Sequence, residues 1–284
     1  MERDGNGWVE CELGHRHWGL HGAAGLLLHT ADSDGTLRVL LQHRAEWCHH
    51  GGTWGLPGGA RDSHETVEEA ALREAVEETA LDGTKVRLRH TFVDDHGGWS
   101  YTTVYADSLT QLETVPNEES AALEWVAADR VPELPLHPGF GHTWRDVQLH
   151  PLTLVVDAAN VVGATPNGWW KDRIGAAAQL GASLAPLIAS TLRAGDIDGV
   201  VTSVVVVVEG QARDAMLPED IETVRATGSG DDALVATVAA HAHRHGRLVV
   251  VTSDRELRQR VTAETGGDAV VRGARWLLDL LREN

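Results

Sequence analysis

Two nearly continuous apolar runs, Leu152–Val156 and Val200–Val208, constrain the fold of this 284-residue chain most strongly. A strand that exposes one face to water alternates polar and apolar residues, so a strand without alternation must be covered on both faces. The patterns that separate or follow these runs are helical at Ile174–Ile188, Asp232–His243 and Glu256–Thr265, and strand-like at Leu248–Thr252. Covered strands that alternate with helices predict an α/β fold built on a parallel sheet.

The first half of the chain has a different pattern. Short strand-like runs alternate with turns at Ala23–His29, Leu37–Gln42, Val86–Val93 and Thr102–Ala106, and one helical pattern covers Glu65 to Thr79. Residues 131–151 hold four prolines and two glycines, and we interpret them as loop or linker. We therefore predict one domain at residues 1–145, a linker at 146–151 and a second domain at 152–284.

The chain is acidic, with a formal net charge of -18, and 42% of its residues are hydrophobic. Residues 1–150 carry 11 basic and 25 acidic side chains, and residues 151–284 carry 13 and 17. Such a chain repels phosphate backbones, which argues against a dedicated nucleic-acid binder and suits a protein whose carboxylates hold cations. No apolar run could span a bilayer, no signal pattern opens the sequence, and two cysteines build no disulfide framework, so we expect a cytoplasmic protein without a membrane partner.

The most informative segment runs from Gly58 to Leu81, where a glycine-rich turn leads into an acidic helix. Asp62 and Glu65 have the spacing of a capping box at its start. Three glutamates share one face of this helix, at i, i+3 and i+4: Glu74, Glu77 and Glu78. Three like charges this close destabilise a bare helix, and a divalent cation would neutralise them. Carboxylate oxygens select Mg²⁺ or Mn²⁺, and Mg²⁺ commonly bridges protein carboxylates to substrate phosphates.

A solvated acidic helix face would also explain these glutamates. The wider spacing favours a site, because the segment resembles the Nudix box, Gly-x5-Glu-x7-Arg-Glu-U-x-Glu-Glu-x-Gly-U, where U is apolar. The matching residues are Gly59, Glu65, Arg73, Glu74, Ala75, Glu77, Glu78 and Leu81. Ala80 stands where the family has glycine, which removes no ligand but costs roughly 1 kcal/mol in a left-handed cap.

The resemblance extends over most of residues 20–145 and implies an α/β/α sandwich around a mixed sheet. Nudix enzymes hydrolyse nucleoside diphosphates linked to another moiety, by attack of water on phosphorus. The metal ligands that the resemblance implies are Gly59, Glu74, Glu77, Glu78 and Glu119. Glu65 and Arg73 would brace the loop and the helix. The catalytic base is then Glu74 or Glu119, and Glu118 and Glu124 compete with Glu119 for its role.

The sequence indicates the substrate-binding residues less clearly than the metal ligands. Arg44 closes a strand-like run and could grip a phosphate, with an exposed structural arginine as the equal alternative. Trp54 and Leu56 precede the box, in a region that lies near the base in resembling proteins. Further candidates for contact with a base are Trp99, Tyr101, His137 and Phe140. Short Nudix domains resemble the MutT-like branch, which acts on nucleoside triphosphates, including oxidised purine ones such as 8-oxo-dGTP.

Acidic residues follow the strand ends or open helices in the second half: Asp157, Glu209, Asp231, Asp232 and Asp254. Carboxyl ends of parallel strands meet at one edge, so these acids could form a second Mg²⁺ site, although ordinary turn and helix-cap chemistry explains each one alone. The set resembles the PIN-like nuclease superfamily, particularly its NYN branch, over about residues 152–280. This implies a Rossmann-like parallel sheet, metal ligands Asp157, Asp231 and Asp254, and a supporting Asn160. Basic residues that could face RNA are Lys171, Arg173, Arg255, Arg258 and Arg260.

We interpret the histidines at 15, 17 and 21, at 49–50 and at 241–245 as ordinary side chains. His241 and His245 have zinc-ligand spacing on a helix, but no third ligand is suggested nearby. The main prediction is a Mg²⁺-dependent Nudix pyrophosphohydrolase acting on a nucleotide. The alternatives are a metal-dependent ribonuclease whose Nudix domain recognises nucleotides, and a non-catalytic nucleotide sensor. A homodimer is left open.

Overall fold

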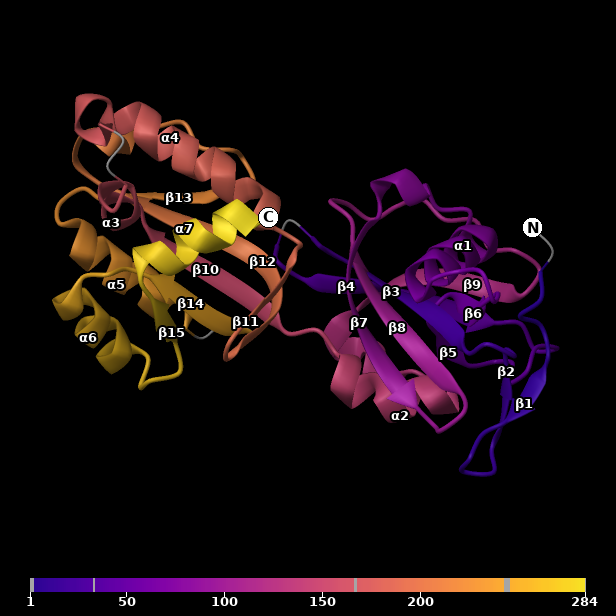
Figure 1. The fold of residues 1–284 in the computed structure, drawn as a ribbon. Coiled ribbons are helices and arrows are strands. Elements are labelled where there is room, and N and C mark those ends of the chain that lie inside the picture. The colour runs from indigo at the N-terminus through magenta and orange to yellow at the C-terminus, as the bar shows by residue number, and fades with distance from the viewer. Residues whose placement is uncertain (1–2, 33, 166–167, 243–245, 284) are drawn as a thin grey trace. The chain divides into compact units, whose positions relative to one another are not determined.

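The computed structural model describes residues 3–32, 34–165, 168–242 and 246–283 (Figure 1). Apart from the short segment at 33–35, the chain divides into a first compact unit that ends at Leu149 and a second that begins at His150. Each unit has its own sheet and its own core. Within the described ranges, no helix is long and apolar enough to cross a membrane.

A seven-stranded sheet forms the centre of the first unit, in the order β5-β4-β3-β8-β7, with β6 paired to β3 and β9 to β4. Its strands are β3 (Ala23–Ala31), β4 (Leu37–Arg44), β5 (Trp54–Gly55), β6 (Gly58–Ala60), β7 (Arg87–Asp95), β8 (Ser100–Asp107) and β9 (Ser120–Ala127). β3 and β8 run parallel and the other pairs antiparallel, so the expected mixed sheet is confirmed. A separate antiparallel hairpin of β1 (Trp8–Glu10) and β2 (Arg16–Trp18) precedes this sheet.

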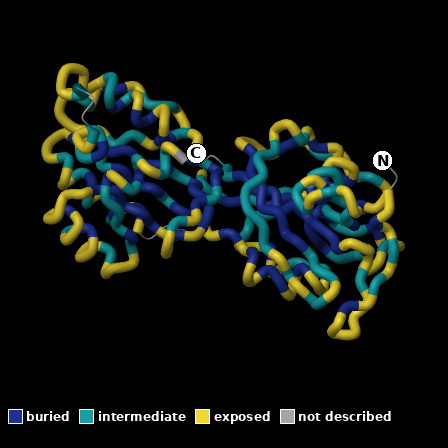
Figure 2. Tube along the Cα trace, viewed as in Figure 1, coloured by how far each residue is buried: buried dark blue, intermediate teal, exposed yellow. Residues whose placement is uncertain are grey.

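One helix covers each face of the first sheet (Figure 1). α1 (Val67–Thr79) buries three alanines against alternate residues of β3 and β4. The residues in this contact are Ala70, Ala71, Ala75, Leu26, Leu28 and Leu40. α2 (Pro138–Val147) lies on the opposite face, where the Tyr105 hydroxyl of β8 donates to the Val147 carbonyl at 3.0 Å. Figure 2 shows the buried strands between more exposed helices, an α/β/α sandwich.

The interpretation of residues 131–151 as loop or linker is wrong, because α2 forms within them. Pro138 occupies the first helical position, where a missing N–H is harmless, and the His137 Nδ1 accepts from the Gly139 N–H at 3.2 Å. The buried side chains of α2 recur at helical spacing: Phe140, Thr143, Trp144 and Val147. Proline content hid this period in the sequence, and α2 belongs to the first sandwich.

A six-stranded sheet forms the second unit. Its strands are β10 (Pro151–Asp157), β11 (Thr191–Ala194), β12 (Ile197–Val208), β13 (Glu222–Arg225), β14 (Arg247–Val251) and β15 (Val270–Arg272). β10 lies between β12 and β14, β13 pairs with β12 and β15 with β14, and all four pairings are parallel. β11 adds an antiparallel edge that the sequence pattern does not predict, so this sheet is mixed as well.

Helices cover both faces of the second sheet, as its unbroken valine runs require. Two core clusters show this, because Leu154 and Val156 face one cluster while Val155 faces the other. The helices are α3 (Ala158–Gly163), α4 (Arg173–Leu184), α5 (Gly230–His241), α6 (Arg255–Glu264) and α7 (Ala274–Glu283). Short 3₁₀ turns lie at Gly83–Lys85, Ala128–Glu133, Trp169–Lys171, Ala185–Leu187 and Gly210–Asp214.

The end of α1 has a non-glycine residue in the left-handed region. Ala80 has φ 54° and ψ 20°, and its N–H donates to the Val76 carbonyl at 2.9 Å. Left-handed backbone costs an alanine about 1 kcal/mol, because its Cβ approaches the following carbonyl. The departure from the family glycine therefore strains the helix end without moving a carboxylate out of α1.

We predict that Ala80→Gly raises the free energy of unfolding by about 0.5–1 kcal/mol, since glycine relieves the strain but gains entropy in the unfolded chain. Urea titration of the full chain measures this. Ala80→Val is the matched variant: its branched Cβ increases the crowding, so it should lower stability. A loss of stability in Ala80→Gly would show that Ala80 does not strain the helix end.

Candidate functional site

A loop between β6 and α1 sets up the site. α1 begins at Val67, with Thr66 as its N-cap, and Thr66 and Glu69 form the capping box. The expected capping box at Asp62 and Glu65 is therefore wrong. The Glu65 side chain does accept from the Asp62 N–H at 3.1 Å, but the Asp62 carboxylate accepts from the Gly5 N–H at 2.7 Å instead. Asp62 thus holds the N-terminal segment against the loop.

Arg73 joins the loop to the helix. Its guanidinium donates to both carboxylate oxygens of Glu65, at 2.6 and 2.8 Å, and to the Ala60 carbonyl at 3.1 Å. A further bond of 2.6 Å reaches Glu74. The hydrogen bonds from Arg73 hold the pKa of Glu65 down at about 2. A bidentate arginine–carboxylate contact fixes geometry as well as charge. Glu65 and Arg73 therefore connect the loop to the helix.

The three box glutamates differ in environment. Glu78 is buried and accepts from the Gly58 N–H at 2.8 Å, and burial raises its pKa to about 7, with a further contribution from the charge of Glu74. Burial also raises the pKa of Glu74, and Arg73 opposes this. Glu77 is exposed and pairs with Arg3. Burial makes the charged forms of Glu74 and Glu78 unfavourable, and a bound cation would offset this.

Gly59 lies directly against Glu74. A Cβ placed on Gly59 would lie 2.7 Å from the carboxyl carbon of Glu74 and 2.9 Å from each carboxyl oxygen. Any side chain at this position would displace the carboxylate. The absence of a Cβ therefore sets where Glu74 lies.

A polar network that sequence reasoning missed supports Glu78 from the strands beneath it. Gln42 on β4 is buried, hydrogen-bonds Glu78 and donates to the Ser120 hydroxyl at 2.9 Å. The Ser120 hydroxyl in turn donates to the side-chain amide oxygen (Oδ1) of Asn117 at 3.1 Å. No sequence signal marks Gln42, because a buried amide in a strand needs a tertiary partner to be recognised.

Asn117 also orders the segment that holds the fourth candidate glutamate. The Glu119 N–H donates to the Asn117 side chain at 3.0 Å, and the Glu119 side chain is exposed just before β9. Glu118 is exposed beside it. Glu124 is exposed opposite Leu41, whereas its neighbours Leu123 and Trp125 pack toward α1. Glu124 therefore lies on the wrong face of the sheet for this site.

The candidate substrate contacts separate into buried and accessible groups. Arg44 is half-buried, and its positive charge acts on both Glu78 and His137. Trp54 is buried, its ring stacked on His43 at 4.7 Å, and Leu56 is buried as well. The structure thus places these two side chains in the core. His137 caps α2, and burial lowers its pKa to about 4.

Among the other aromatic candidates, Phe140 is buried against Trp144 in α2. Tyr101 lies beneath the glutamates, and burial raises the pKa of its hydroxyl, with a contribution from the charge of Glu78. Trp99 stacks on His17. Trp47, in the loop after Arg44, is 69% exposed, and sequence analysis did not single it out.

Comparison with known proteins places this geometry in a family. The model of the NUDIX domain matches residues 19–146. A putative 8-oxo-dGTP diphosphatase 3 of Mycobacterium tuberculosis is 54% identical over 157 residues, which are 53% of this chain and 72% of that protein. The chain belongs to the Nudix hydrolase family. Enzymes of this family act on phosphoric anhydride bonds.

Two further known proteins are similar to this chain. An 8-oxo-dGTP diphosphatase of Proteus vulgaris is 36% identical over 98 residues, covering 32% of this chain and 83% of that protein. The crystal structure of the Nudix hydrolase RenU from M. smegmatis has 54% identity and a TM-score of 0.49, and it covers 50% of this chain and 92% of that chain. The family match lies in the first unit, which contains the Nudix box.

Acidic residues also meet in the second unit. Asp157 ends β10, accepts from the Asn160 N–H at 3.1 Å and accepts from the Thr252 hydroxyl at 2.9 Å. Burial raises the pKa of Asp157, and the charges of Asp231 and Glu209 raise it further. Burial also raises the pKa of Asp231, with the charge of Asp254 next. The candidate residues of this unit therefore come together at the carboxyl edge of its parallel strands.

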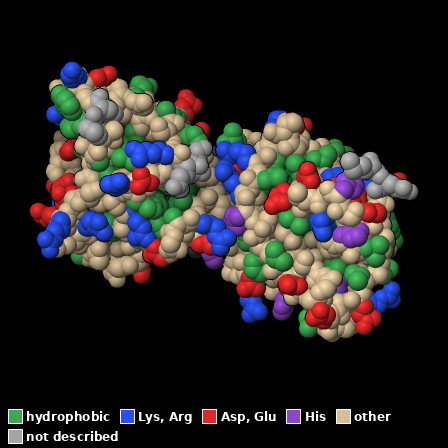
Figure 3. Space-filling model, in the orientation of Figure 1, with side chains coloured by type: hydrophobic (Ala, Val, Ile, Leu, Met, Phe, Trp, Pro, Cys, Tyr) green, Lys and Arg blue, Asp and Glu red, His purple; other side chains and the backbone are tan. Residues whose placement is uncertain are grey.

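Asp157 and Asp254 also have a structural role. Asp157 caps α3, and Asp254 caps α6 by accepting from the Leu257 N–H at 2.8 Å. The Asn160 side chain accepts from the Ser253 N–H at 2.8 Å. On the face shown in Figure 3, basic side chains of this unit are interspersed with acidic ones. The proximity of the acids is thus compatible with both a site and ordinary capping.

Of the histidine pair in this unit, only His241 lies within the described residues. His241 is buried in α5, where Nδ1 contacts the Thr237 carbonyl at 2.8 Å and Nε2 the Glu222 carboxylate at 3.3 Å. His245 lies outside the described residues. Both ring nitrogens of His241 are therefore already engaged.

We predict that Gly59→Ala lowers the kcat of Nudix hydrolysis at least about 10-fold, about 1.4 kcal/mol, with little change in melting temperature. The three atoms nearest the added Cβ are all at the end of the Glu74 side chain, which can move aside without disturbing the backbone. Steady-state kinetics and a thermal melt measure the two effects.

Gly58→Ala is the matched comparison, because its Cβ would collide with the backbone of Ala24 and Gly25. This variant should lose stability as well as activity. Full activity in Gly59→Ala would show that the position of Glu74 does not limit hydrolysis.

Proposed function

We propose that the first unit is a Mg²⁺-dependent pyrophosphohydrolase of nucleoside triphosphates, with an oxidised purine nucleotide such as 8-oxo-dGTP as its substrate. The observation that carries this proposal is the desolvated pair Glu74 and Glu78, held beside the gap at Gly59. Two relatives are named as 8-oxo-dGTP diphosphatases, one of them at 54% identity, which supports the substrate class.

The residues present fit a magnesium ion. Glu74, Glu77 and Glu78 would hold it, together with the backbone at Gly59, and all are hard oxygen donors. Burial raises the pKa of Glu74 and Glu78, so a cation beside them would restore their charged forms. When bound, Mg²⁺ would neutralise charge on the phosphate oxygens and lower the pKa of a water. A sensor would not require this full set of carboxylates.

The residues of the chain would have separate roles in hydrolysis. Arg73 and Glu65 keep the loop and α1 in one geometry, and Gln42 and the Gly58 N–H fix the Glu78 carboxylate. Glu74 or Glu119 takes the proton of the attacking water. The water oxygen bonds to phosphorus as the bridging P–O bond breaks, and the products are a nucleoside monophosphate and pyrophosphate.

Substrate recognition follows from charge and exposure. Arg44 has its charge within reach of Glu78, so it would contact the phosphates that the metal also binds. Trp47 follows in the next loop with an exposed ring, which makes it a surface on which a purine could stack. The half-buried His137 ring is the further candidate, whereas Trp54 and Leu56 would support the site from the core.

We expect Glu78→Gln to reduce kcat at least about 100-fold, about 2.7 kcal/mol, because the variant removes a ligand charge while keeping the side-chain size. The measurement is pyrophosphate release from 8-oxo-dGTP and from ordinary nucleoside triphosphates with Mg²⁺. Glu68→Gln, on the same helix but outside the cluster, should retain activity.

ADP-ribose, dinucleoside polyphosphates and nucleotide sugars complete the panel. Hydrolysis of one of these in place of the triphosphates would retain the Nudix site and replace the substrate. Undiminished turnover in Glu78→Gln would contradict the proposed metal site.

A second candidate function rests on the acids of the second unit. We propose a PIN/NYN-type metal-dependent ribonuclease site of Asp157, Asp231 and Asp254, with Asn160 in support. The burial of Asp157 beside Asp231 and Glu209 favours this, because a cation would offset their mutual repulsion. The Nudix unit would then recognise a nucleotide or hydrolyse it independently.

Asp157→Asn should abolish cleavage of a labelled RNA with Mg²⁺ or Mn²⁺ and leave nucleotide hydrolysis unchanged, since Asn keeps the helix cap and removes the charge. Glu78→Gln should show the converse. RNA cleavage that persists in Asp157→Asn would exclude Asp157 as a required ligand. Absence of RNA cleavage by the unmodified chain would contradict the nuclease activity itself.

A further inference from the structure

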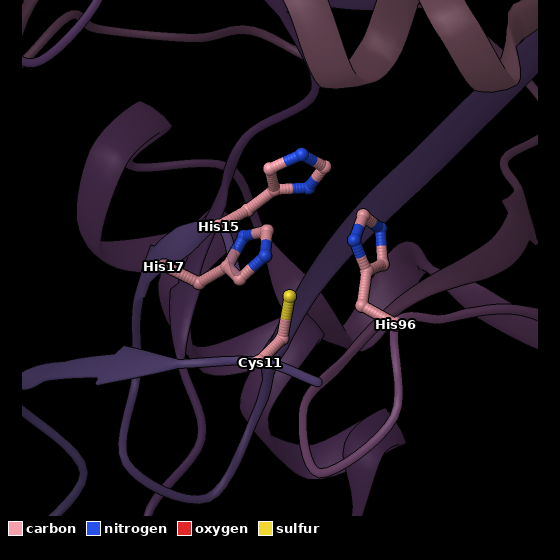
Figure 4. Close-up of side chains that lie close together, drawn as sticks. All are labelled: Cys11, His15, His17 and His96. Atoms are coloured by element: carbon pink, nitrogen blue, oxygen red, sulfur yellow. The ribbon is translucent and has the colours of Figure 1, made fainter. Parts of the chain in front are cut away.

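A cysteine and three histidines converge at one end of the first unit, apart from the Nudix glutamates. Cys11, His15 and His17 belong to the β1–β2 hairpin, and His96 to the turn between β7 and β8 (Figure 4). One ligand atom from each of the four lies within 4.8 Å of the others. Figure 4 shows the sulfur and the three rings pointing toward a common centre.

The backbone around these residues is ordered by its own hydrogen bonds. The Cys11 N–H donates to the His15 carbonyl and the Gly14 N–H to the Cys11 carbonyl, both at 2.9 Å, which closes the hairpin tightly. Gly14 has φ 78°, a conformation that glycine adopts without strain. The Glu12 N–H then donates to the Gly97 carbonyl at 2.9 Å, so the hairpin is fixed to the turn that carries His96.

Two ring nitrogens of the cluster are buried without a hydrogen-bond partner in the described part of the chain. These are Nε2 of His17 and Nδ1 of His96. A buried polar atom without a partner costs about 1–3 kcal/mol. The other nitrogen of His96, Nε2, lies 3.2 Å from the Asp94 carboxylate. A carboxylate behind one ring nitrogen is the arrangement that orients a histidine to bind metal through the other.

The surroundings hold the rings in place. The His17 ring stacks on Trp99, with centroids 3.9 Å apart and planes at 7°. The Trp99 indole N–H is itself anchored, donating to the Gly19 carbonyl at 3.0 Å. Cys11 is only 5% exposed, so its sulfur faces the cluster rather than water. Orientation by packing of this kind is what a metal site requires of its ligands.

We propose that Cys11, His15, His17 and His96 bind a structural zinc ion. One thiolate and three imidazoles are the borderline and soft donors that select Zn²⁺, whereas Mg²⁺ prefers oxygen. Tetrahedral zinc holds its donor atoms about 3.3–3.8 Å apart, so donor atoms within 4.8 Å of one another need to draw together by no more than about 1.5 Å. Four protein ligands fill the coordination shell, which makes the site structural and not catalytic.

The ion would clamp the N-terminal hairpin next to the loop that carries the Nudix box. The Arg61 guanidinium donates to the His21 carbonyl at 2.8 Å, and the Gly5 N–H donates to Asp62 at 2.7 Å. A Cβ on Gly19 would lie 3.5 Å from Cα of Ala60, so the chain after β2 packs on β6. The zinc site is separate from the hydrolase proposal, since none of its ligands belongs to the glutamate cluster.

Metal content is the first test. The full chain, purified with Mg²⁺ in excess and dialysed, should retain about one equivalent of zinc by plasma mass spectrometry. Cys11→Ser and His96→Ala should each lower this at least about 10-fold. Cys48→Ser and His142→Ala are the matched controls, since Cys48 is outside the cluster and His142 is exposed, and both should keep the zinc.

Cobalt substitution tests the ligand set without any variant. The chain loaded with Co²⁺ in excess Mg²⁺ should show a sulfur-to-cobalt charge-transfer band and the intense visible bands of tetrahedral cobalt. Cobalt on the Nudix carboxylates or on the His49, His50 and His137 group gives no sulfur band. The band should persist in Cys48→Ser.

Thermal melting completes the test. A strong chelator should lower the melting temperature of the unmodified chain, and Zn²⁺ but not Mg²⁺ should restore it, because a ligand of the folded state stabilises that state. A chain that retains no zinc and gives no sulfur–cobalt band overturns the proposal. Full zinc content in Cys11→Ser would equally overturn it.

Discussion

The Nudix site depends on where one guanidinium lies. Arg73 contacts the loop through Glu65, the end of β6 through the Ala60 carbonyl, and the acidic cluster through Glu74. These three parts are separated in sequence, and no other described side chain joins all of them. A flexible lysine could not reproduce this, since it carries one charged nitrogen and not a planar fork. Arg73 therefore fixes the loop relative to the helix, together with the hydrogen bond from the Gly58 N–H to Glu78.

In this arrangement of loop and helix, two of the box glutamates are shielded from water. Glu78 is buried beside Gln42, and Glu74 lies against a glycine that leaves no room for another side chain. Both pKa values are raised because burial disfavours the charged form. Arg73 compensates for part of this at Glu74 but not at Glu78. The stability of the site and the cation affinity that we propose for it are thus two aspects of the same desolvation.

Much of this arrangement could be predicted from the sequence. Unbroken valine runs required strands covered on both faces, and the core residues Val155 and Val156 do face opposite sides. The box spacing placed Glu74 and Glu78 on one helix face. Local sequence patterns were enough to predict these two features, because each feature depends only on the periodicity of residues along the chain.

What sequence reasoning missed depends on contacts between distant segments. α2 was hidden by the prolines of residues 131–151, although Phe140 and Trp144 already had helical spacing. Thr66 and Glu69 have the capping-box spacing and cap α1, whereas Asp62, which has the same spacing to Glu65, is engaged by the Gly5 N–H. Trp54 and Leu56 are beside the box in sequence but in the core in space. His15 and His17 were set aside for want of further ligands, and the fold supplies Cys11 and His96.

The two proposed metal sites of the first unit would prefer different cations, because one offers hard and the other softer ligands. Glu74 and Glu78 offer only oxygen, in a loop and helix where a substrate phosphate must also find a place on the metal. Cys11 and the three histidines offer sulfur and nitrogen, and they leave no position for a substrate. Mg²⁺ therefore binds the second set poorly, because thiolate and imidazole add little for it, whereas the same donors hold Zn²⁺ tightly. Ligand chemistry alone would then let one small domain bind an exchangeable catalytic ion at one site and a fixed structural ion at the other.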